Sequence, residues 1–578
     1  MSLKVLGLSG ALTHDPSAAI YIDGKLIAAA EEERFTRDKH AKNKMPVEAA
    51  RFCLQYAGLK PNDIDVVAFP YAKVSLLSGA RWHFAKRYWY APERSLEAIF
   101  NGNRRYRRNV KRVRGLLEEI GIDWNGIEFD AVEHHLAHAS SAYHLSGIKE
   151  KTAILGIDGK GEYATTFFGY GEKGEIHKIK EFYDPDSLGQ LYASVTEYLG
   201  FEMLDGEYKV MGMAPYGDPS RYDLSRLIEC DGRNIKVNTE LVNTVGLRRY
   251  KEGRKGYYFS QKLIDWLGPR REGDIADDPY IHYAASIQKL FEDTSLRLID
   301  VYLGDILKET GKLVFSGGGA LNVKLNQKIL ELPYVEELFV QPAASDAGTA
   351  VGAASYASWR RSVPPETMKH VYLGPEYTTE ECIEACSKHE DKPVFERIDD
   401  VPGRAAEILA AGNPLAWCQG RMEFGPRALG GRSILGCPSH SGIADKINEQ
   451  IKFRERWRPF CPSILDTIAQ DMIQTDHAAP FMTITFNVSE EWKQRVPEVI
   501  HEDGTSRVQI VSEETNPRYY ALLKEMEKLT GNGVVLNTSM NRRGEPVVCS
   551  PTDALNMFFG SDLQFLLLED LLVTKQTA

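Results

Sequence analysis

Closely paired cysteines are absent from this sequence. Its 8 cysteines are scattered along the chain, and no two of them form a Cys-x-x-Cys pair. Neither a zinc ribbon nor a disulfide framework is therefore indicated. Cys382 and Cys386 share a helix face but have no matching second pair, which favours a packing role. This cysteine usage fits a reducing, cytoplasmic compartment.

Long apolar runs and excess positive charge are also missing. No run is long enough to span a bilayer, and the amino terminus lacks the apolar region of a signal peptide. The formal net charge of −11 argues against a general nucleic-acid binder. At 578 residues the chain is too long for one core, so two or more domains are expected. Nothing in the sequence indicates an oligomeric state.

The most informative segment of the sequence is residues 133–161, where we predict a short helix followed by a buried strand. His134 and His138 are four residues apart and share one helix face. The apolar run 152–157 ends at Asp158, which is followed by glycines. Two imidazoles and a carboxylate suit a first-row divalent ion. The alternative is a surface helix with two solvated histidines. The absence of His-Glu-x-x-His argues against a metalloprotease helix.

A plan of strand, polar turn and hairpin occurs twice. Residues 4–34 contain a strand, a polar turn that includes His14, and two strands joined at Asp23-Gly24, a type I′ hairpin signal. Residues 152–182 repeat this plan, with a glycine-rich turn at 171–174. Two such units indicate internal duplication. That arrangement is typical of the actin-like ATPase fold, in which the two turns clasp a nucleotide's phosphates.

Other small-residue segments are candidate nucleotide contacts. Lys209 lies in a glycine-rich stretch that we predict to be a loop. A strand followed by glycines and a helix spans 313–330, where backbone amides can approach a nucleotide closely. Its candidate residues are Gly317, Gly318, Gly319 and Asn322. Asp346 precedes a helix of small residues and is either a fourth metal ligand or a helix N-cap.

Residues 72–120 are helical, basic and aromatic. These side chains could form either a solvated helix face or the edge of a binding site for an anionic or sugar-bearing substrate. We favour the solvated face, because runs of charged residues are usually solvated. Two prolines at 362–368 mark a linker. A second domain is expected from residue 369 to the end.

The second domain is rich in arginine although the protein is acidic. Guanidinium groups match phosphate oxygens in a bidentate manner, so we predict a pocket for a highly phosphorylated small molecule. A buried strand and polar turn at 533–548 add amide and hydroxyl groups suited to orienting a carbonyl or phosphate. The candidates are Arg421, Arg427, Arg432, Lys452, Arg454, Arg456, Arg458, Asn537, Ser539 and Asn541.

Many long motifs occur in one order along nearly the whole chain. They include THDPSAAI, EERFTR, HHLAHASSAY, GEYKVMGMAPYG, SGGGALN, SDAGTAVGAA, EFGPRALGGRSIL, IKFRERWRPF, DGTSRVQ and NTSMN. With these motifs the chain resembles the O-carbamoyltransferases of natural-product and nodulation-factor biosynthesis.

The resemblance implies an α/β chain with two domains. Residues 1–362 would be a duplicated actin-like domain that transfers the carbamoyl group and holds a metal. Residues 369–578 would be an α+β domain similar to the synthase of threonylcarbamoyl adenylate. This second domain would form carbamoyl adenylate from carbamoyl phosphate and ATP, releasing phosphate and pyrophosphate. The first would pass the carbamoyl group to a hydroxyl of a sugar or polyketide type acceptor, releasing AMP.

The resemblance also implies roles for particular residues. His134, His138, Asp158 and Asp346 would hold iron(II). His14 would be the candidate base for the acceptor hydroxyl, with Lys39 nearby. Mg²⁺ is a further candidate because ATP is a co-substrate.

Two alternative functions are disfavoured by the sequence. Carbamoyl transfer in hydrogenase maturation uses related domains, but that family adds an acylphosphatase domain and cysteine-pair zinc sites before them. This sequence opens on the actin-like strand and has no Cys-x-x-Cys, so that function is disfavoured. A non-catalytic nucleotide-binding module or sugar-kinase-like protein would leave the predicted metal ligands and arginines without a purpose.

Overall fold

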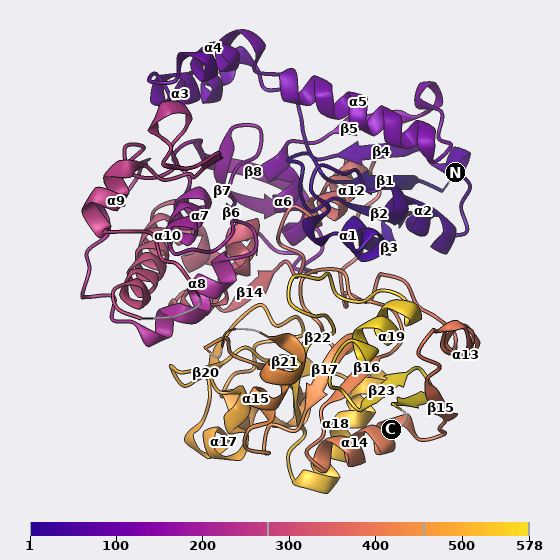
Figure 1. Cartoon of the computed structure of the whole chain (residues 1–578). Helices are drawn as coiled ribbons and strands as arrows, with labels where there is room; N and C mark the ends of the chain where they lie inside the picture. Colours follow the sequence, from indigo (N-terminus) through magenta and orange to yellow (C-terminus); the bar gives the residue numbers. More distant parts are fainter. Residues whose placement is uncertain (1, 274–276, 454, 456, 576–578) are drawn as a thin grey trace. The chain divides into compact units, whose positions relative to one another are not determined.

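The chain divides into two compact units. The computed structural model describes residues 2–273, 277–453, 455 and 457–575 (Figure 1). The first unit contains the residues up to Ile27 and Asn43–Thr367, and the second contains Ala28–Lys42 and the residues from Met368 onward.

The expected domain division placed residues 28–42 in the first domain, but they belong to the second unit. Their contacts within the second unit explain the difference. The amide of Ala29 donates to the carbonyl of Leu373 (3.1 Å). Arg37 donates to the carbonyls of Val547 (2.6 Å) and Pro546 (2.8 Å). A sequence pattern of local strands and helices does not reveal such long-range contacts.

The first unit contains two sheets with the same strand order. One sheet has the order β3-β2-β1-β4-β5 and the other the order β8-β7-β6-β13-β14. In each sheet the first three strands along the chain are antiparallel and the last two add in parallel. This matching topology confirms the predicted duplication and the actin-like architecture. The strands are β1 Lys4–Leu8, β2 Ser17–Ile22, β3 Lys25–Glu31, β4 Val66–Phe69, β5 Glu128–Ala131, β6 Thr152–Ile157, β7 Ala164–Glu172, β8 Glu175–Tyr183, β13 Lys312–Ser316 and β14 Glu337–Val340.

Both predicted hairpins have the same turn geometry. The φ angles are 50° at Asp23 and 83° at Gly24, and 52° at Lys173 and 87° at Gly174. Positive φ at both central residues is the property of a type I′ turn, which matches the twist of the paired strands. The sequence prediction of the first hairpin is confirmed, and the second repeats it.

Two helices of small residues form the middle of the first unit. α12 (Gly348–Arg360) packs on β1 and β2, whereas α6 (His134–Tyr143) packs on β6 and β13, and the two helices pack against each other (Figure 1). Their approach is closest at Gly352, where an added Cβ would lie 1.9 Å from the carbonyl oxygen of Ala137. The small residues therefore bring the start of α6 close to the start of α12.

Replacing Gly352 with alanine should lower the free energy of unfolding by about 1–3 kcal/mol, because backbone has to move to admit the methyl group. Gly115 in α5 (Arg104–Glu119) is the matched control, since an added Cβ there meets no atom within 4 Å. Gly115→Ala should instead raise stability by about 0.5–1 kcal/mol. Urea denaturation measures both, and equal effects would contradict the close helix packing.

The remaining helices of the first unit cover the outer faces of the sheets or form insertions. The long helix α10 (Tyr280–Thr310) ends at Gly311, whose φ is 69°. The predicted loop around Lys209 is wrong: this residue lies on a short helix. These helices are α2 Val47–Tyr56, α3 Ala80–Arg87, α4 Pro92–Asn101, α7 Leu188–Tyr198, α8 Glu207–Met213, α9 Gln261–Leu267, α10 Tyr280–Thr310 and α11 Val323–Leu330.

The basic and aromatic region forms α3, α4 and α5. Two of its arginines hold the helices in place. Arg81 is buried and donates to the carbonyls of Ala98 and Ile99, and Arg87 pairs with Asp186 at 2.8 Å. Many of the other side chains of α3, α4 and α5 face solvent, which agrees with the solvated helix face that the sequence predicted. A role of this region toward an acceptor stays a prediction.

The second unit is built on an eight-stranded mixed sheet with the order β15-β24-β23-β16-β17-β22-β18-β21. Helices α14 and α18 pack together over a core that includes Trp417, Leu435 and Tyr519. The likeness to the adenylate-forming synthase stays a prediction. The main elements are α1 Glu32–Thr36, α13 Thr379–Lys388, β15 Val394–Arg397, α14 Val401–Ala410, β16 Leu415–Cys418, β17 Arg432–Gly436, α15 Ile443–Ile447, β18 Cys461–Leu465, α16 Ala469–Ile473, α17 Glu490–Arg495, β21 Gln509–Val511, α18 Pro517–Thr530, β22 Val534–Ser539, α19 Pro551–Phe559, β23 Phe565–Leu568 and β24 Leu571–Thr574.

In the described part of the chain, no helix combines the length and the apolar character needed to cross a bilayer.

Candidate functional site

The four predicted metal ligands meet in the first unit. His134 and His138 come from α6, Asp158 follows β6, and Asp346 precedes α12. All four are buried, and one ligand atom from each lies within 4.8 Å of the others. His134 Nε2 lies 3.2 Å from His138 Nε2 and 3.4 Å from Asp346 Oδ1. The distances are 3.7 Å from His134 Nε2 to Asp158 Oδ2 and from His138 Nε2 to Asp346 Oδ1. The solvated-histidine alternative is thus excluded.

Surrounding groups orient these donors. His134 Nδ1 lies 3.3 Å from the carbonyl oxygen of Pro70, which favours the tautomer that leaves Nε2 free as a ligand. The Gly318 amide donates to Asp158 Oδ1 (3.1 Å). The N-cap of α12 is Ala347, without a side-chain cap bond, so Asp346 is not the cap that the sequence left open.

The charges of the cluster are strongly coupled. Burial disfavours ionised Asp346, but His134 and His14 outweigh it and hold the pKa of this carboxyl well below its usual value. Burial also disfavours the His134 imidazolium, yet Asp346 and Asp158 raise the pKa of His134 well above its usual value. For Asp158, the His134 hydrogen bond outweighs burial and lowers the pKa to about 2. The two carboxylates therefore favour positive charge in the cluster, carried either by the imidazoles or by a bound cation.

A transition-metal ion fits this demand. Two donors bound to one ion at roughly 2.0–2.2 Å lie roughly 3–4 Å apart, and the four donor separations given above, 3.2–3.7 Å, fall in that range. Two imidazole nitrogens and two carboxylate oxygens also match a first-row divalent ion. Asp346 Oδ2 is buried without a hydrogen-bond partner among the described residues. This carboxylate thus has acceptor capacity that a cation can use.

His14 lies at the edge of this cluster, in the turn between β1 and β2. Its Nε2 is 3.8 Å from Asp346 Oδ2, and its Nδ1 is 3.2 Å from Asp15 Oδ2. Burial opposes the imidazolium, but Asp346 and Asp15 prevail and raise the pKa of His14 to about 9. A cation bound at Asp346 would offset the charge that causes this rise. The φ angles of 74° at Thr13 and 46° at Asp15 show a constrained turn, as functional loops often are.

The glycine turn after β13 packs directly against the end of β6. Gly317 has a φ of 88°, and an added Cβ would lie 2.3 Å from the carbonyl oxygen of Ile157. The turn therefore positions Asp158, and a contact of Gly317–Gly319 with a nucleotide stays a prediction. Asn322 caps α11 by accepting from the Leu325 amide (3.0 Å), and its side chain pairs with Gln288.

Sequence reasoning missed Glu162 and His135. Glu162 accepts from the His134 amide (3.2 Å) and the Ala72 amide (2.7 Å), so a carboxylate lies at the N-terminus of α6. Burial raises the pKa of Glu162 to about 7. His135 is buried beside the ligands, and burial together with His134 lowers its pKa to about 3. The carboxylate four residues after Asp158 was the available signal, but its pattern is that of a surface turn.

In the second unit, three predicted residues meet at the end of β22. Lys452 Nζ donates to the carbonyl of Ser539 (2.7 Å), the carbonyl of Asn541 (2.9 Å) and Asn541 Oδ1 (2.7 Å). Asn537 lies two residues before Ser539 and donates to Ala428 O (3.1 Å). Its Oδ1 is buried without a hydrogen-bond partner in the described part of the chain. These residues form a polar site on one side of the sheet.

The arginines of this unit have different roles. Arg432 is fully buried, and its guanidinium donates to the carbonyls of Gln419, Gly420, Gly431, Pro375 and Cys549. Because backbone carbonyls accept the hydrogen bonds of this guanidinium, Arg432 has a structural role, and the predicted contact between Arg432 and a phosphate is wrong. Arg421 likewise donates to the carbonyls of Leu373 (2.6 Å) and Gly374 (3.2 Å).

Arg427 is half-buried on the loop between β16 and β17. Arg458 Nη1 lies 3.6 Å from Glu455 Oε2. Arg454 and Arg456 lie outside the described residues.

The two remaining lysines are placed in different units. Lys39 belongs to the segment Ala28–Lys42 of the second unit, whereas His14 belongs to the first. The expected proximity of Lys39 to His14 stays a prediction. Lys209 Nζ lies 5.6 Å from the centre of the Phe201 ring in the first unit.

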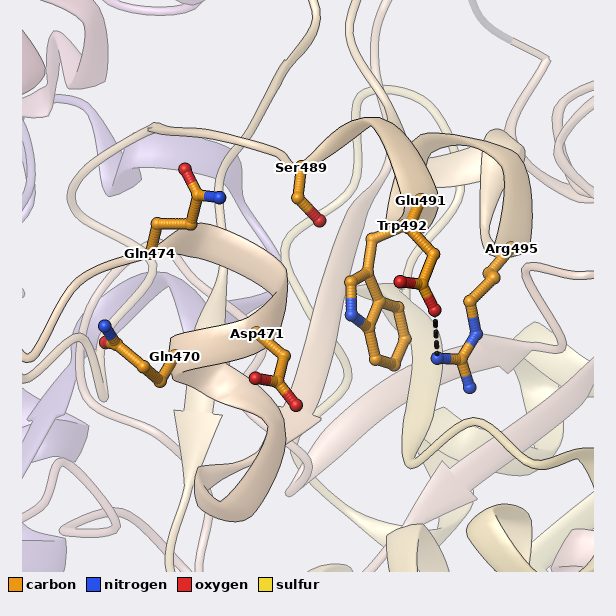
Figure 2. A pocket seen from close by; sticks show the side chains of 7 residues that line it. All are labelled: Gln470, Asp471, Gln474, Ser489, Glu491, Trp492 and Arg495. Atoms are coloured by element: carbon orange, nitrogen blue, oxygen red, sulfur yellow. Dashed lines mark hydrogen bonds and ion pairs between the residues drawn. The ribbon is translucent and has the colours of Figure 1, made fainter.

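A separate pocket of the second unit lies between α16 and α17 (Figure 2). Its lining residues are Gln470, Asp471, Gln474, Ser489, Glu491, Trp492 and Arg495. None of the predicted site residues is among them.

The fold and the site define a two-unit α/β enzyme with a buried histidine–aspartate centre. Two family models match the chain, Carbamoyltransferase N-terminus over residues 4–355 and Carbamoyltransferase C-terminus over residues 406–575. The chain therefore belongs to the carbamoyltransferase family, and it is a carbamoyltransferase. This confirms the resemblance to the O-carbamoyltransferases that its motifs indicated.

Individual relatives agree with this assignment. Nodulation protein NolNO of Sinorhizobium fredii is 37% identical over 590 residues, covering 99% of this chain and 81% of the relative. Nodulation protein NolO of Bradyrhizobium diazoefficiens is 37% identical over 461 residues, covering 77% of this chain and 79% of the relative. An activator of 2-hydroxyisocaproyl-CoA dehydratase from Clostridium difficile, solved with bound ADPNP, covers 63% of this chain and 97% of its own. Its 11% identity and TM-score of 0.33 carry no functional argument.

Proposed function

We propose that this chain is an ATP-dependent O-carbamoyltransferase that works in two half-reactions. The second unit forms carbamoyl adenylate from carbamoyl phosphate and ATP. The first unit transfers the carbamoyl group to a hydroxyl of a small-molecule acceptor of sugar or polyketide type. The observation that carries this proposal is the buried cluster of His134, His138, Asp158 and Asp346 with His14 at its edge.

Water releases phosphate from carbamoyl phosphate and leaves carbamate. A carbamate oxygen then attacks the α-phosphorus of ATP, and pyrophosphate leaves. The acceptor oxygen next attacks the carbamoyl carbon of the adenylate, the bond to AMP breaks, and the hydroxyl proton passes to a base. AMP is a far better leaving group than the oxygen of free carbamate, which is the reason for the first half-reaction.

In the first unit we assign the base role to His14. Its Nε2 lies close to Asp346, beside the donor cluster. A histidine positioned in this way can accept a hydroxyl proton as the bond to the carbamoyl carbon forms. The four donors would hold iron(II), a borderline ion that accepts both imidazole and carboxylate. When bound, such an ion supplies Lewis-acid polarisation of a carbonyl or phosphoryl oxygen.

In the second unit we assign phosphate and carbonyl contacts to the polar site at the end of β22. Lys452 brings a buried positive charge there, and the unpartnered Asn537 Oδ1 provides a directed acceptor. Arg427 and Arg458 are half-buried and are assigned to the phosphates of the substrates. Mg²⁺ is expected to accompany ATP, because it commonly binds through substrate phosphates.

Product analysis tests this proposal. With labelled carbamoyl phosphate and ATP, we expect pyrophosphate and phosphate to appear in equal amounts. Adding an acceptor hydroxyl should release AMP and transfer the label to the acceptor. Screening sugars and polyketide alcohols as acceptors then identifies the class. Formation of ADP instead of pyrophosphate would indicate a kinase, and label transfer without ATP consumption would exclude the adenylate route.

A further inference from the structure

The motif EERFTR at residues 32–37 has no role in the two half-reactions, yet it belongs to the second unit. It forms α1, which directly follows β3. Three charged side chains of this region are almost completely buried, Glu31, Glu32 and Arg34. Glu31 and Arg34, with 6% and 4% of their surface exposed, form an ion pair. Burying an ion pair costs desolvation energy and is poor evidence of a stabilising role. The contacts of the pair therefore need another explanation.

Both members of the pair bind the same residue, Gly425. The Gly425 amide donates to Glu31 Oε1 (2.8 Å), and Arg34 Nη2 donates to the Gly425 carbonyl (2.9 Å). Arg34 Nη2 also donates to Glu31 Oε1 (3.2 Å), which closes the arrangement. Gly425 has a φ of 117°, a conformation that side chains rarely adopt. The pair thus fixes both backbone polar groups of a glycine whose conformation other residues rarely adopt.

The far end of the same loop is fixed by a second carboxylate. Glu423 Oε1 accepts from the amides of Leu429 (2.7 Å), Gly431 (2.7 Å) and Arg432 (3.3 Å). Between the two anchored ends lie Pro426, Arg427 and Ala428. The Ala428 carbonyl accepts from Asn537, which belongs to the polar site at the end of β22.

We infer that Glu31 and Arg34 are positioning residues for the adenylate-forming site. They hold Gly425 so that Arg427, two residues further on, is presented to the phosphate-bearing substrates beside Asn537. This inference rests on the proposed function, because it assigns Arg427 to the first half-reaction.

The test measures the two half-reactions separately in Arg34→Lys. A lysine cannot donate from one planar group to both Glu31 and the Gly425 carbonyl in the same geometry. We expect kcat/KM for pyrophosphate release to fall by about 10- to 100-fold, the effect of a small displacement of a substrate-binding group. Transfer from supplied carbamoyl adenylate should be unchanged. Glu31→Gln keeps an acceptor for the Gly425 amide but removes the charge, and it should show a loss of the same kind.

Arg37→Lys is the matched control. Arg37 lies on the same segment and also donates to backbone carbonyls, but those belong to Pro546 and Val547 rather than to the loop. It should retain pyrophosphate release. An equal loss in Arg37→Lys would show that docking of the whole segment is what matters, and would overturn the inference.

A double-mutant cycle separates positioning from a general structural effect. If Arg34 acts through Arg427, then Arg427→Ala should cost much less in the Arg34→Lys background than in the wild type. Additive losses, or wild-type kinetics in Arg34→Lys and Glu31→Gln, would overturn the inference while leaving the proposed function intact. A wild-type enzyme that releases no pyrophosphate would overturn the proposed function itself, and this inference with it.

Discussion

Purified His138→Ala is expected to lack its metal ion and to have lost carbamoyl transfer. The His138 Nε2 is one of four donors, only 3.2 Å from His134 Nε2 and 3.7 Å from Asp346 Oδ1. Changing residues that merely orient a ligand already costs about 10- to 100-fold in metal affinity, so loss of a ligand should cost more than about 100-fold. Elemental analysis should find about one first-row ion per chain in the wild type, best matched to iron, and almost none in the variant.

His144→Gln provides the control on the same helix. The His144 ring contacts Ser140 Oγ and the Gly174 carbonyl, both at 2.8 Å, and it is not among the four donors. This variant should keep its ion even if it is less stable. Full metal occupancy in His138→Ala would remove His138 from the ligand set, and loss of the ion from both variants would point to general damage to α6.

Local sequence signals predicted much of the first unit. The hairpin at Asp23-Gly24, the helix of small residues after Asp346 and the strand ending at Asp158 all follow from short-range chemistry, namely turn residues, periodicity and apolar runs. The duplicated plan then places the ends of the two central strands and the starts of α6 and α12 together. The histidine pair and Asp158 could be grouped from local signals, whereas Asp346 joined them only through the resemblance of the motifs to the O-carbamoyltransferases.

Long-range contacts set the limit of such prediction. Arg432 carries the same charge as Arg427, but it is surrounded by backbone carbonyls that come from distant loops. Residues 28–42 continue a strand of the first unit and yet belong to the second, through contacts with residues near 373, 425 and 547. Glu162 reads as a turn residue and is a buried carboxylate at a helix N-terminus. No local pattern distinguishes these cases.

His14→Asn is expected to lower carbamoyl transfer while leaving the first half-reaction intact. Asparagine has a similar size and can hydrogen-bond, but it cannot accept the proton of the acceptor hydroxyl. General-base catalysis is typically worth roughly 100- to 10,000-fold, and transfer from supplied carbamoyl adenylate should fall by about that factor. Pyrophosphate release should stay near normal, because it is assigned to the second unit. The metal content should also be retained, since His14 is not among the four donors.

The main alternative to a role of His14 as the base is a structural role in the turn that carries it. Thr13 and Asp15 have positive φ angles, and Ser17 Oγ donates to the Ala347 carbonyl (2.6 Å), so the turn is tied to the residue next to Asp346. A histidine that only supports this turn would, when replaced, release the ion or lower the melting temperature. His177→Asn, on β8 and partly exposed, serves as the control for the substitution itself. Transfer at the wild-type rate in His14→Asn would exclude His14 from the mechanism. A slow variant that keeps its ion and its stability would establish the base, because geometry, metal and fold would all be preserved and only the proton acceptor would be missing.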